Sequence, residues 1–388
     1  MADIVVLATA DWDHPLWTNK QHVALALHAE GHRVLYVESL GLRSAQSTGR
    51  DLKRILRRLW KGLRPPRRIQ PGLWVWSPLV LPGGSQGLSL SVNRISLRCG
   101  LWFALRMIGF SRPWLWTYNP LTARFLNLEG FRPQIYHAVD ALQEQPCMPR
   151  EVIETEERRL CALVDQVFVT SPELERQLRP YSKHIRFDPN VADQSHFAQA
   201  MTLPTSEIPS DLAAISGPRI GFMGAVSSYK LDFRLIASVA RRHSSWNFVF
   251  VGPVGEGEPY TDIALLESAP NIHLLGMRPY AQLPAYCSGF DCAWLPLRLN
   301  PYTQSMFPMK FFEYLGAGLP VVATAIDALK PYSCAAELCP SDADHFDLAL
   351  QRCLDGQAAA LSTRLEIASE HTYTSRTRKM LATLENRQ

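Results

Sequence analysis

The sequence predicts an α/β protein with two doubly wound parallel sheets, one in each half of the chain. Apolar strand-like runs alternate with helix-like runs from the N-terminus, which is typical of parallel sheets covered by helices. The alternation stops in a polar, Pro- and Ser-rich stretch at about 198–217 and then begins again. The 388 residues are enough for two domains of ordinary size.

The predicted elements follow one another in the same order in both halves. In the first half the strand-like runs are 3–9, 33–39, 113–119, 133–140 and 165–172, with helices over 19–31 and about 150–164. In the second half the strand-like runs are 219–226, 246–253, 271–277, 290–297 and 319–325, with helices from about 231, near 283 and over 308–316. We expect an N-terminal domain over 1–200, a linker over 201–217 and a C-terminal domain over 218–369. A final helix at about 370–388 is expected to pack back on the first domain.

Composition narrows the class of protein. Apolar residues make up 47% of the chain and charged residues 20%, as in globular proteins. The eight cysteines form no CxxC pair and no zinc spacing, which favours free thiols in a reducing cytoplasm. A strand-like run follows Met1 at once, so we expect no secretory signal. The sequence contains no stretch of 18 uncharged apolar residues, so we expect no transmembrane helix.

Basic residues are concentrated near the N-terminus. Residues 1–113 contain 16 Lys and Arg against 6 Asp and Glu, and half of these basic residues lie in 51–70. Over about 51–68 an apolar stripe alternates with a basic face at helical spacing, and 88–110 is more apolar but carries only positive charge. This pattern favours a peripheral contact with an anionic membrane surface over nucleic-acid binding, with a solvated surface helix as the alternative.

The run SMFPMKFFEYLGAGLPVVAT, residues 305–324, points to phosphate binding. Pro308 suits the first turn of a helix, and Lys310 and Glu313 then lie within one turn of its start. A positive side chain beside free backbone N–H groups is a place to hold phosphate. Met309 lies in the same turn, and Gly224, at the end of another strand of this half, lets a ligand approach the backbone closely.

Two common nucleotide-binding patterns are missing from the sequence. Neither first strand is followed by G-x-G-x-x-G, and G-x-x-x-x-G-K-[ST] occurs nowhere, which disfavours a dinucleotide dehydrogenase and a P-loop NTPase.

The motifs together resemble the two-domain, metal-independent glycosyltransferases of the GT-B fold, in which two Rossmann-like domains face a central cleft. FDPNVADQSHF (187–197) resembles their P-N-G-V-D-x-x-x-F run, and residues 270–297 resemble their base-binding region. The most specific match is PMKFFEYLGAGLPVV. Ser305 stands where the large retaining family has the first Glu of a pair. The local pattern is closer to bacterial exopolysaccharide and teichuronic-acid transferases, including the inverting xanthan glucuronosyltransferase.

The resemblance assigns roles to these residues. It places the donor diphosphate on Lys310 and the ribose on Glu313, and it makes Asp140, in YHAVDALQ, the general base. Met277 and Arg278 would offer backbone groups to the base edge. Lys230 and Arg298 are further candidates for the phosphates. No metal and no cofactor is implied, because the nucleotide sugar, with a UDP-sugar favoured, is itself a substrate.

The acceptor side is predicted from the first half of the chain. The loop TADWDHPLWTNKQH is rich in Trp, His and Asn, which suit stacking on a sugar and hydrogen bonding to it. Its candidate acceptor contacts are Asp13, His14, Asn19 and His22, each with a structural role as the alternative. His137 is a rival to Asp140 as the base, and either residue could instead cap the segment that follows.

We therefore expect a cytoplasmic hexosyltransferase, peripheral on the inner face of a bacterial cell membrane, that builds a lipid-linked or envelope glycan with inversion. Three alternatives stay open: a nucleotide-sugar epimerase or phosphorylase of the same fold, a retaining glycosyltransferase, and a non-catalytic membrane-associated partner. The sugar, the acceptor and the oligomeric state are not predicted.

Overall fold

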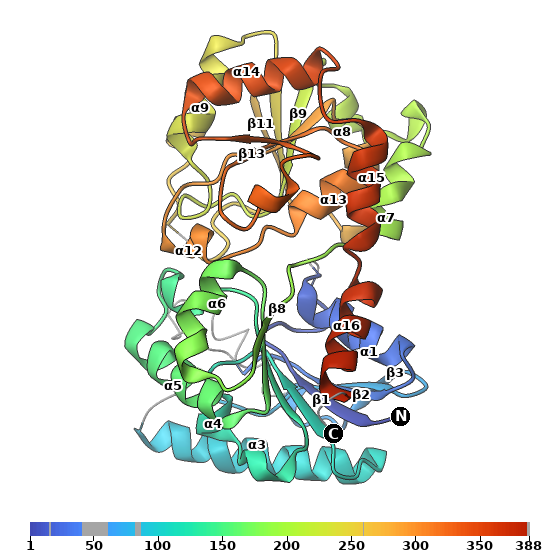
Figure 1. The fold of residues 1–388 in the computed structure, drawn as a ribbon, viewed down its shortest axis with the longest axis vertical. Helices are drawn as coiled ribbons and strands as arrows, with labels where there is room; N and C mark the ends of the chain where they lie inside the picture. Colours follow the sequence, from blue (N-terminus) through green and yellow to red (C-terminus); the bar gives the residue numbers. More distant parts are fainter. Residues whose placement is uncertain (15–16, 41–60, 82–86, 259, 386–388) are drawn as a thin grey trace. The chain divides into compact units, whose positions relative to one another are not determined.

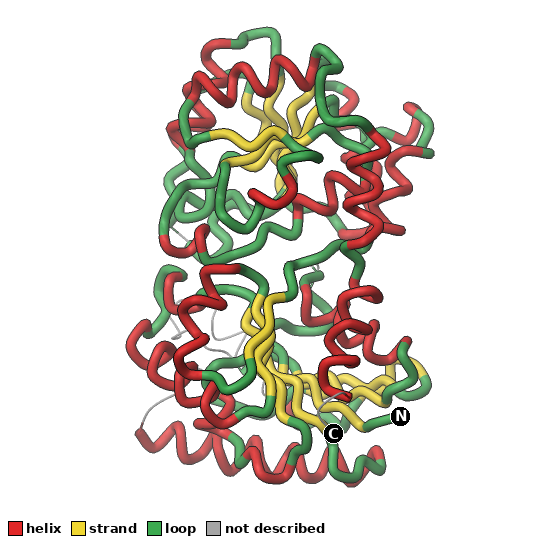
Figure 2. The backbone as a smooth tube through the Cα atoms, viewed as in Figure 1, coloured by secondary structure: helices red, strands yellow, loops and turns green. Residues whose placement is uncertain are grey.

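A computed structural model describes residues 1–14, 17–40, 61–81, 87–258 and 260–385. The chain divides into two compact units, of which the first contains 1–188 and 377–388 and the second 189–376. Each unit holds one sheet with helices packed against it, as the tube in Figure 2 shows. Both predicted sheets, and their strand–helix alternation, are confirmed.

The first unit contains an eight-stranded sheet in the order β3-β4-β2-β1-β5-β6-β7-β8. All neighbouring strands are parallel except β3 and β4. The strands are β1 Asp3–Leu7, β2 Arg33–Val37, β3 Arg67–Gln70, β4 Leu73–Trp76, β5 Trp114–Thr117, β6 Gln134–Ala138, β7 Gln166–Val169 and β8 Ile185–Phe187. Most of them are short and apolar, whereas β3 is polar and exposed. Strands β1, β2, β6 and β7 are buried almost throughout, as parallel strands between two helical layers must be.

Helices cover both faces of this sheet (Figure 1). One apolar core gathers side chains from α3 Gly87–Ile108, α4 Thr122–Phe125, α5 Arg150–Leu163 and α6 Pro172–Leu178. Two further helices of the described residues, α1 Asn19–Ala29 and α16 Tyr373–Glu385, lie side by side and are joined by an ion pair of 2.7 Å between Arg378 and Glu30. Residues 377–388, in which most of α16 lies, are grouped with the first unit.

The second unit contains a six-stranded parallel sheet in the order β11-β10-β9-β12-β13-β14. Its strands are β9 Arg219–Met223, β10 Asn247–Val251, β11 Ile272–Gly276, β12 Cys292–Leu295, β13 Val321–Thr324 and β14 Glu337–Cys339. The helices are α7 Gln194–Ala198, α8 Ser210–Ala213, α9 Phe233–Arg242, α10 Ala264–Glu267, α11 Leu283–Cys287, α12 Pro301–Gln304, α13 Lys310–Gly316, α14 Ala343–Leu354 and α15 Leu361–Glu370.

The division between the units lies earlier than the sequence predicts. The stretch 201–217, expected to be a linker, belongs to the second unit and contains the short helix α8. The reason is packing, because Leu212 of α8 is buried in the core of that unit and α7 packs against α13. Proline and serine mark breaks in regular structure here rather than a connection between domains.

The basic N-terminal segments fold differently from each other. Residues 51–60 of the predicted amphipathic helix lie outside the described residues, and at its end 67–70 form strand β3 rather than helix. The second segment is the long helix α3. No helix in the described ranges is both long and apolar enough to cross a bilayer. All eight cysteines are free thiols.

Candidate functional site

Three neighbouring strands of the second unit end in glycines with positive φ. Gly224 follows β9, Gly252 follows β10 and Gly276 ends β11, with φ of 147°, 157° and 75°. The Gly224 N–H donates to the Val251 carbonyl and the Gly252 N–H to the Gly276 carbonyl, each at 2.9 Å. A Cβ on Gly252 would lie 1.9 Å from the Gly224 oxygen, so no other residue fits there. This edge of the sheet therefore presents bare backbone, as close approach of a ligand requires.

Helix α13 is fixed beside that edge by contacts at both ends. The Asn190 amide donates to the Phe307 carbonyl at 2.7 Å, just before the helix begins. The Tyr314 hydroxyl accepts a hydrogen bond of 2.6 Å from the Met223 N–H at the end of β9. Pro308 and Met309 lie immediately before the helix, and the Phe311 N–H bonds the Pro308 carbonyl at 3.0 Å. The sequence predicts the turn correctly but places the helix start two residues early.

Lys310 and Glu313 form the polar centre of this edge. The Lys310 Nζ lies 2.7 Å from the Glu313 Oε2, and the Glu313 side chain is 3% exposed. A Cβ built on Gly224 would lie 4.0 Å from the Lys310 Cε, so the lysine side chain passes over the glycine turn after β9. The structure thus brings together Lys310, Glu313 and Gly224, which are up to 89 positions apart in the chain. A cation above bare backbone suits a phosphate, and a buried carboxylate suits hydroxyl donors.

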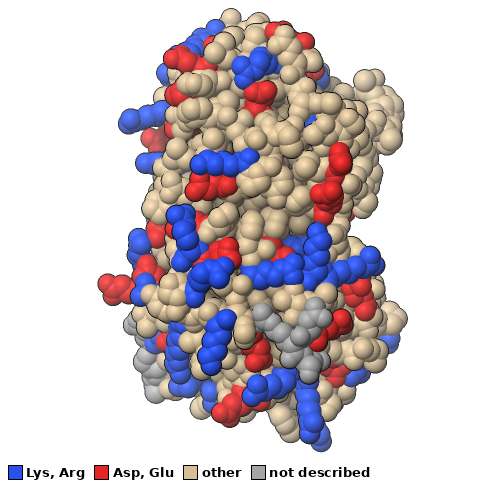
Figure 3. All heavy atoms as spheres, viewed as in Figure 1, with Lys and Arg blue, Asp and Glu red and all other residues tan. Residues whose placement is uncertain are grey.

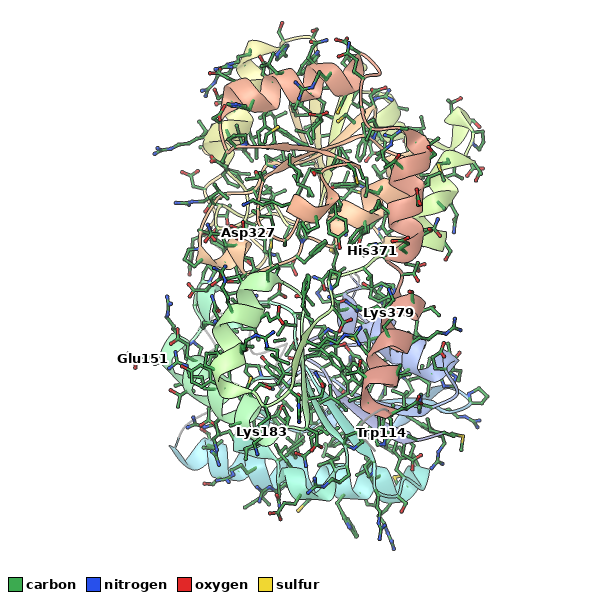
Figure 4. All side chains as sticks on the ribbon, viewed as in Figure 1. Trp114, Glu151, Lys183, Asp327, His371 and Lys379 are labelled. Atoms are coloured by element: carbon green, nitrogen blue, oxygen red, sulfur yellow. The ribbon has the colours of Figure 1, made fainter. Side chains whose placement is uncertain are left out.

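The imidazole ring of His371 packs against α13. His371, labelled in Figure 4 where α15 ends, stacks on Phe312 with ring centroids 4.3 Å apart. Its Nε2 lies 3.0 Å from the Tyr332 hydroxyl, and its carbonyl accepts the Ala192 N–H at 3.1 Å. No residue of this support was predicted from sequence, because its members come from three separate stretches of chain.

A second basic pair lies on the loops after β9 and β12. The Arg298 N–H donates to the Lys230 carbonyl at 3.0 Å, which ties the two loops together. The Lys230 ammonium lies 5.3 Å from the centre of the Tyr229 ring. In an open α/β sheet ligands bind outside the carboxyl ends of the strands where the strand order reverses, and β9 and β12 flank that point. Both predicted residues are therefore on the loops where a ligand is expected.

The loop after β11 is held by an ion pair that the sequence did not reveal. The Arg278 guanidinium lies 2.6 Å from the Asp211 carboxylate and 2.7 Å from the Tyr286 hydroxyl, and it also donates to the Met277 carbonyl at 3.0 Å. Burial alone would raise the pKa of Asp211, but the hydrogen bonds from Arg278 and Tyr286 hold it below its ordinary value. The Arg278 side chain thus shapes the loop, and Met277, half-exposed, lies at its tip.

Tyr280, on the same loop, is another residue that was not predicted. Its ring stacks on His196 of α7 with centroids 4.3 Å apart. Burial raises the pKa of the Tyr280 hydroxyl, and the negative charge of Glu313 raises it further. The Tyr280 side chain therefore stays a neutral phenol.

In the first unit, Asp140 follows β6 at the carboxyl edge of the sheet. It is half-buried, and the preceding Val139 carbonyl accepts a hydrogen bond of 2.8 Å from the Thr170 hydroxyl after β7. His137 lies within β6 and is completely buried, where its Nδ1 accepts from the Trp116 indole at 3.3 Å. This environment favours the structural alternative for His137 and leaves Asp140 as the accessible one of the two.

The first loop of this unit has fewer accessible polar groups than the sequence suggested. Asn19 and His22 are buried on α1, which favours structural roles, and His14 is exposed. Asp13 pairs with Arg67 at 2.8 Å. The loop is anchored by Glu38, a buried residue that was not predicted, which accepts the Trp12 N–H at 2.9 Å and also bonds the Ser77 hydroxyl.

Within the described part of the chain, no group of three or more His, Cys, Asp or Glu side chains is arranged to hold a metal ion. The positive side chains at the second unit's edge include Lys310, Lys230 and Arg298, besides Arg278, which is paired with Asp211. These are the groups available to meet an anionic ligand there.

The comparisons with known proteins agree with this geometry. Residues 217–355, which contain the glycine edge and α13, match the family model described as Glycosyl transferases group 1. A Bacillus subtilis (strain 168) protein named as a glycosyltransferase of teichuronic acid biosynthesis is 29% identical over 191 residues. That match spans 47% of this chain and 47% of the relative, about half of each.

Solved structures match nearly the whole chain in fold. Sucrose-phosphate synthase of Thermosynechococcus elongatus superposes with a TM-score of 0.72 at 15% identity, covering 100% of this chain and 99% of its own. An Anabaena protein, HepE, solved with UDP-glucose, gives 0.68 at 14% identity and covers 100% of both chains. The predicted GT-B fold is confirmed, and the stretch that matches the group 1 glycosyltransferase model lies within the second unit.

Proposed function

From the premise that the chain has the GT-B fold with a group 1 glycosyltransferase domain, we propose that it transfers a sugar from a nucleotide diphosphate donor to a lipid-linked or envelope glycan. The second unit binds the donor, with a UDP-sugar favoured, and the first unit binds the acceptor at an anionic membrane surface. The transfer proceeds with inversion and without a metal. The observation that carries the proposal is the Lys310–Glu313 pair beside the bare backbone of Gly224.

The donor site follows from the charges at this edge. As the glycosidic bond to the diphosphate breaks, negative charge grows on the departing phosphate oxygens, and fixed positive groups stabilise it. Lys310 is the nearest such group to the Gly224 backbone, with Lys230 and Arg298 on the adjoining loops. Glu313 supplies two carboxylate oxygens, which suit the neighbouring hydroxyls of a ribose. The Lys310 ammonium and the Glu313 carboxylate form an ion pair of 2.7 Å, which holds both side chains at this edge.

The residues at positions 305 and 140 support the inverting mechanism. Ser305, completely buried at the end of α12, cannot act as a donor-side carboxylate. Asp140 is a carboxylate at the edge of the acceptor-binding unit, and it can accept the proton of an attacking hydroxyl. The proton leaves the acceptor oxygen for Asp140, the new glycosidic bond forms, and the nucleoside diphosphate leaves with the bonding electron pair.

A thermal-shift screen against UDP-, GDP- and dTDP-sugars tests the donor assignment. A ligand that binds the native state raises Tm, by an amount set by its concentration relative to Kd. We expect UDP-sugars to raise Tm in the wild type and to have a smaller effect in Lys310→Ala. Absence of any shift with all three nucleotide classes would refute the donor site. Conversion of the nucleotide sugar without an acceptor would instead indicate an epimerase.

A further inference from the structure

Helix α3 has two apolar faces, and only one of them is buried in the first unit. Leu97, Leu101 and Ala104 belong to the core. On the opposite side Ile95, Trp102, Phe103 and Met107 are 65%, 64%, 56% and 54% exposed. Val92 and Cys99 are exposed on the same side, so the row recurs every three or four residues along the helix. Single exposed apolar residues are ordinary, but a continuous row of large ones marks an interaction surface.

The buried face of α3 is fixed in place, so the helix cannot turn to hide the outer one. The Asn93 amide bonds both the N–H and the carbonyl of Leu81, at 2.7 and 3.0 Å, and Ser96 donates to the Leu79 carbonyl at 2.6 Å. At Gly100 a Cβ would lie 2.7 Å from the Trp76 ring, so the backbone there rests directly on the indole. The outer face of α3, defined by Ile95, Trp102, Phe103 and Met107, is thus a stable feature of the unit.

Charge indicates what covers this face. Residues 87–112 contain no Asp or Glu, and the Arg side chains at 94, 98, 106 and 112 are all exposed. Figure 3 shows Lys and Arg side chains, with a few Asp or Glu among them, along the edge of the first unit where Figure 1 places α3. The Arg106 guanidinium lies 5.9 Å from the Trp102 ring centre, at the border of the apolar row. Two copies meeting through this face would bring like charges together, whereas an anionic lipid surface offers both an apolar interior and phosphates.

We propose that the outer face of α3 docks on a bilayer that contains anionic phospholipids. Ile95, Trp102, Phe103 and Met107 enter the boundary between headgroups and acyl chains, where Trp is favoured, and Arg94 and Arg106 meet the lipid phosphates. The inference rests on the proposed function only for the reason to dock, because a lipid-linked acceptor would be presented at the membrane surface. Docking itself does not depend on the donor site.

The test is co-sedimentation of the full chain with vesicles of phosphatidylcholine containing about one-third phosphatidylglycerol, beside pure phosphatidylcholine. Trp102→Ser/Phe103→Ser should weaken partition about tenfold or more, at low and at high salt. Arg94→Gln/Arg106→Gln should weaken it several-fold at low salt only, because salt screens exposed charges. The matched controls are Leu348→Ser on α14, whose side chain is 62% exposed, and Arg234→Gln on α9, and both should bind like the wild type.

Three outcomes would overturn the proposal. One is wild-type partition of Trp102→Ser/Phe103→Ser, and another is an equal loss in the Leu348→Ser control. The third is a dimer in solution that this double variant dissociates, which would make the face a contact between copies. Titration with UDP on the same samples separates this test from the proposed function. Vesicle binding without nucleotide binding would support the membrane surface and refute the donor site. Nucleotide binding without vesicle binding would support the donor site and refute the membrane surface.

Discussion

The carboxyl edges of the two sheets are built from different groups. In the second unit the edge is made of backbone, with the Gly224 N–H bonded to the Val251 carbonyl, the Gly252 N–H bonded to the Gly276 carbonyl, and α13 bonded to the end of β9. In the first unit the edge depends on side chains of longer loops, held by a buried carboxylate, Glu38. An edge made of backbone keeps its hydrogen-bonding groups whatever side chains surround it, whereas an edge made of loop side chains changes with the loop sequence.

Substitution of Asp140 should have the largest effect, and it tests whether the two units have separate roles. Asp140→Asn keeps the size of the side chain but cannot accept the acceptor proton, so transfer should fall by about a thousandfold. Donor binding should not change, because the donor contacts lie on the other unit. The measurement is a steady-state transfer assay beside a UDP titration of the same variant, with the product anomer read by NMR coupling. An active Asn variant, or an α-linked product from an α-linked donor, would show that Asp140 is not the base.

The units should also differ in how their stability depends on pH. Glu157 on α5 is completely enclosed beside the Tyr136 hydroxyl, and burial raises its pKa from 4.5 to about 7. Between these values the unfolded chain has lost a proton that the folded unit keeps, so stability falls as pH rises and levels off above about 7. The expected loss is about 3 kcal/mol.

Glu157→Gln should remove this dependence and stabilise the first unit at pH 8. Urea unfolding at several pH values between 4 and 8 measures the effect. The control is Tyr136→Phe, which removes a hydrogen bond that lowers the pKa of Glu157 in the folded state. The fall in stability should then begin at the same pH and extend to higher pH. If the wild type and Glu157→Gln show the same pH profile, the carboxyl does not titrate as the structure indicates.

Lys310 tests the second unit's edge. Lys310→Ala should lower turnover by about a hundredfold, as loss of one charge partner for the leaving group does. Lys330→Ala is the matched control, because Lys330 forms the same kind of i,i+3 pair, at 2.7 Å with Asp327, on an exposed turn. A Lys310→Ala variant that melts like the wild type and keeps near-full activity would remove the phosphate assignment.

The smallest expected effect concerns the Asp211–Arg278 pair. Asp211→Asn keeps the shape but removes the charge that holds the Arg278 guanidinium, so the loop after β11 should loosen. We expect KM for the donor to rise about threefold with kcat unchanged, as for loss of uniform binding. Asp344→Asn, which breaks an exposed 2.6 Å pair with Arg242, should leave KM unaltered. A fall in kcat with constant KM would place Asp211 in the chemical step instead.

Local patterns predicted much of the second unit and less of the first. Short apolar runs ending in glycine gave the strands of the second sheet, and Pro308 and Lys310 gave the turn before α13. The support behind that turn, His371 on Phe312, was out of reach because it joins residues 59 positions apart. Asp211 was overlooked for another reason, since its polar surroundings resembled a linker.

The first unit shows a different limit of sequence reasoning. Asn19 and His22 belong to residue types that bind sugars, yet α1 carries them into the interior. The type of a residue predicts its chemistry, but only the packing of the helix that carries it decides whether a ligand can reach it. For α3 the pattern did predict an apolar, basic segment, and the structure adds which side chains face outward.

The return of α16 to the first unit has a consequence for the order in which the protein is made. Met380, Leu381 and Leu384 are buried, and Arg186 near the end of β8 bonds the Lys379 carbonyl at 3.0 Å. These partners are separated by the whole of the second unit. On the ribosome, the second unit is therefore complete in sequence while the first still lacks a helix. Until residues 377–385 emerge, the surface beside α1 that they cover stays open to chaperones and proteases.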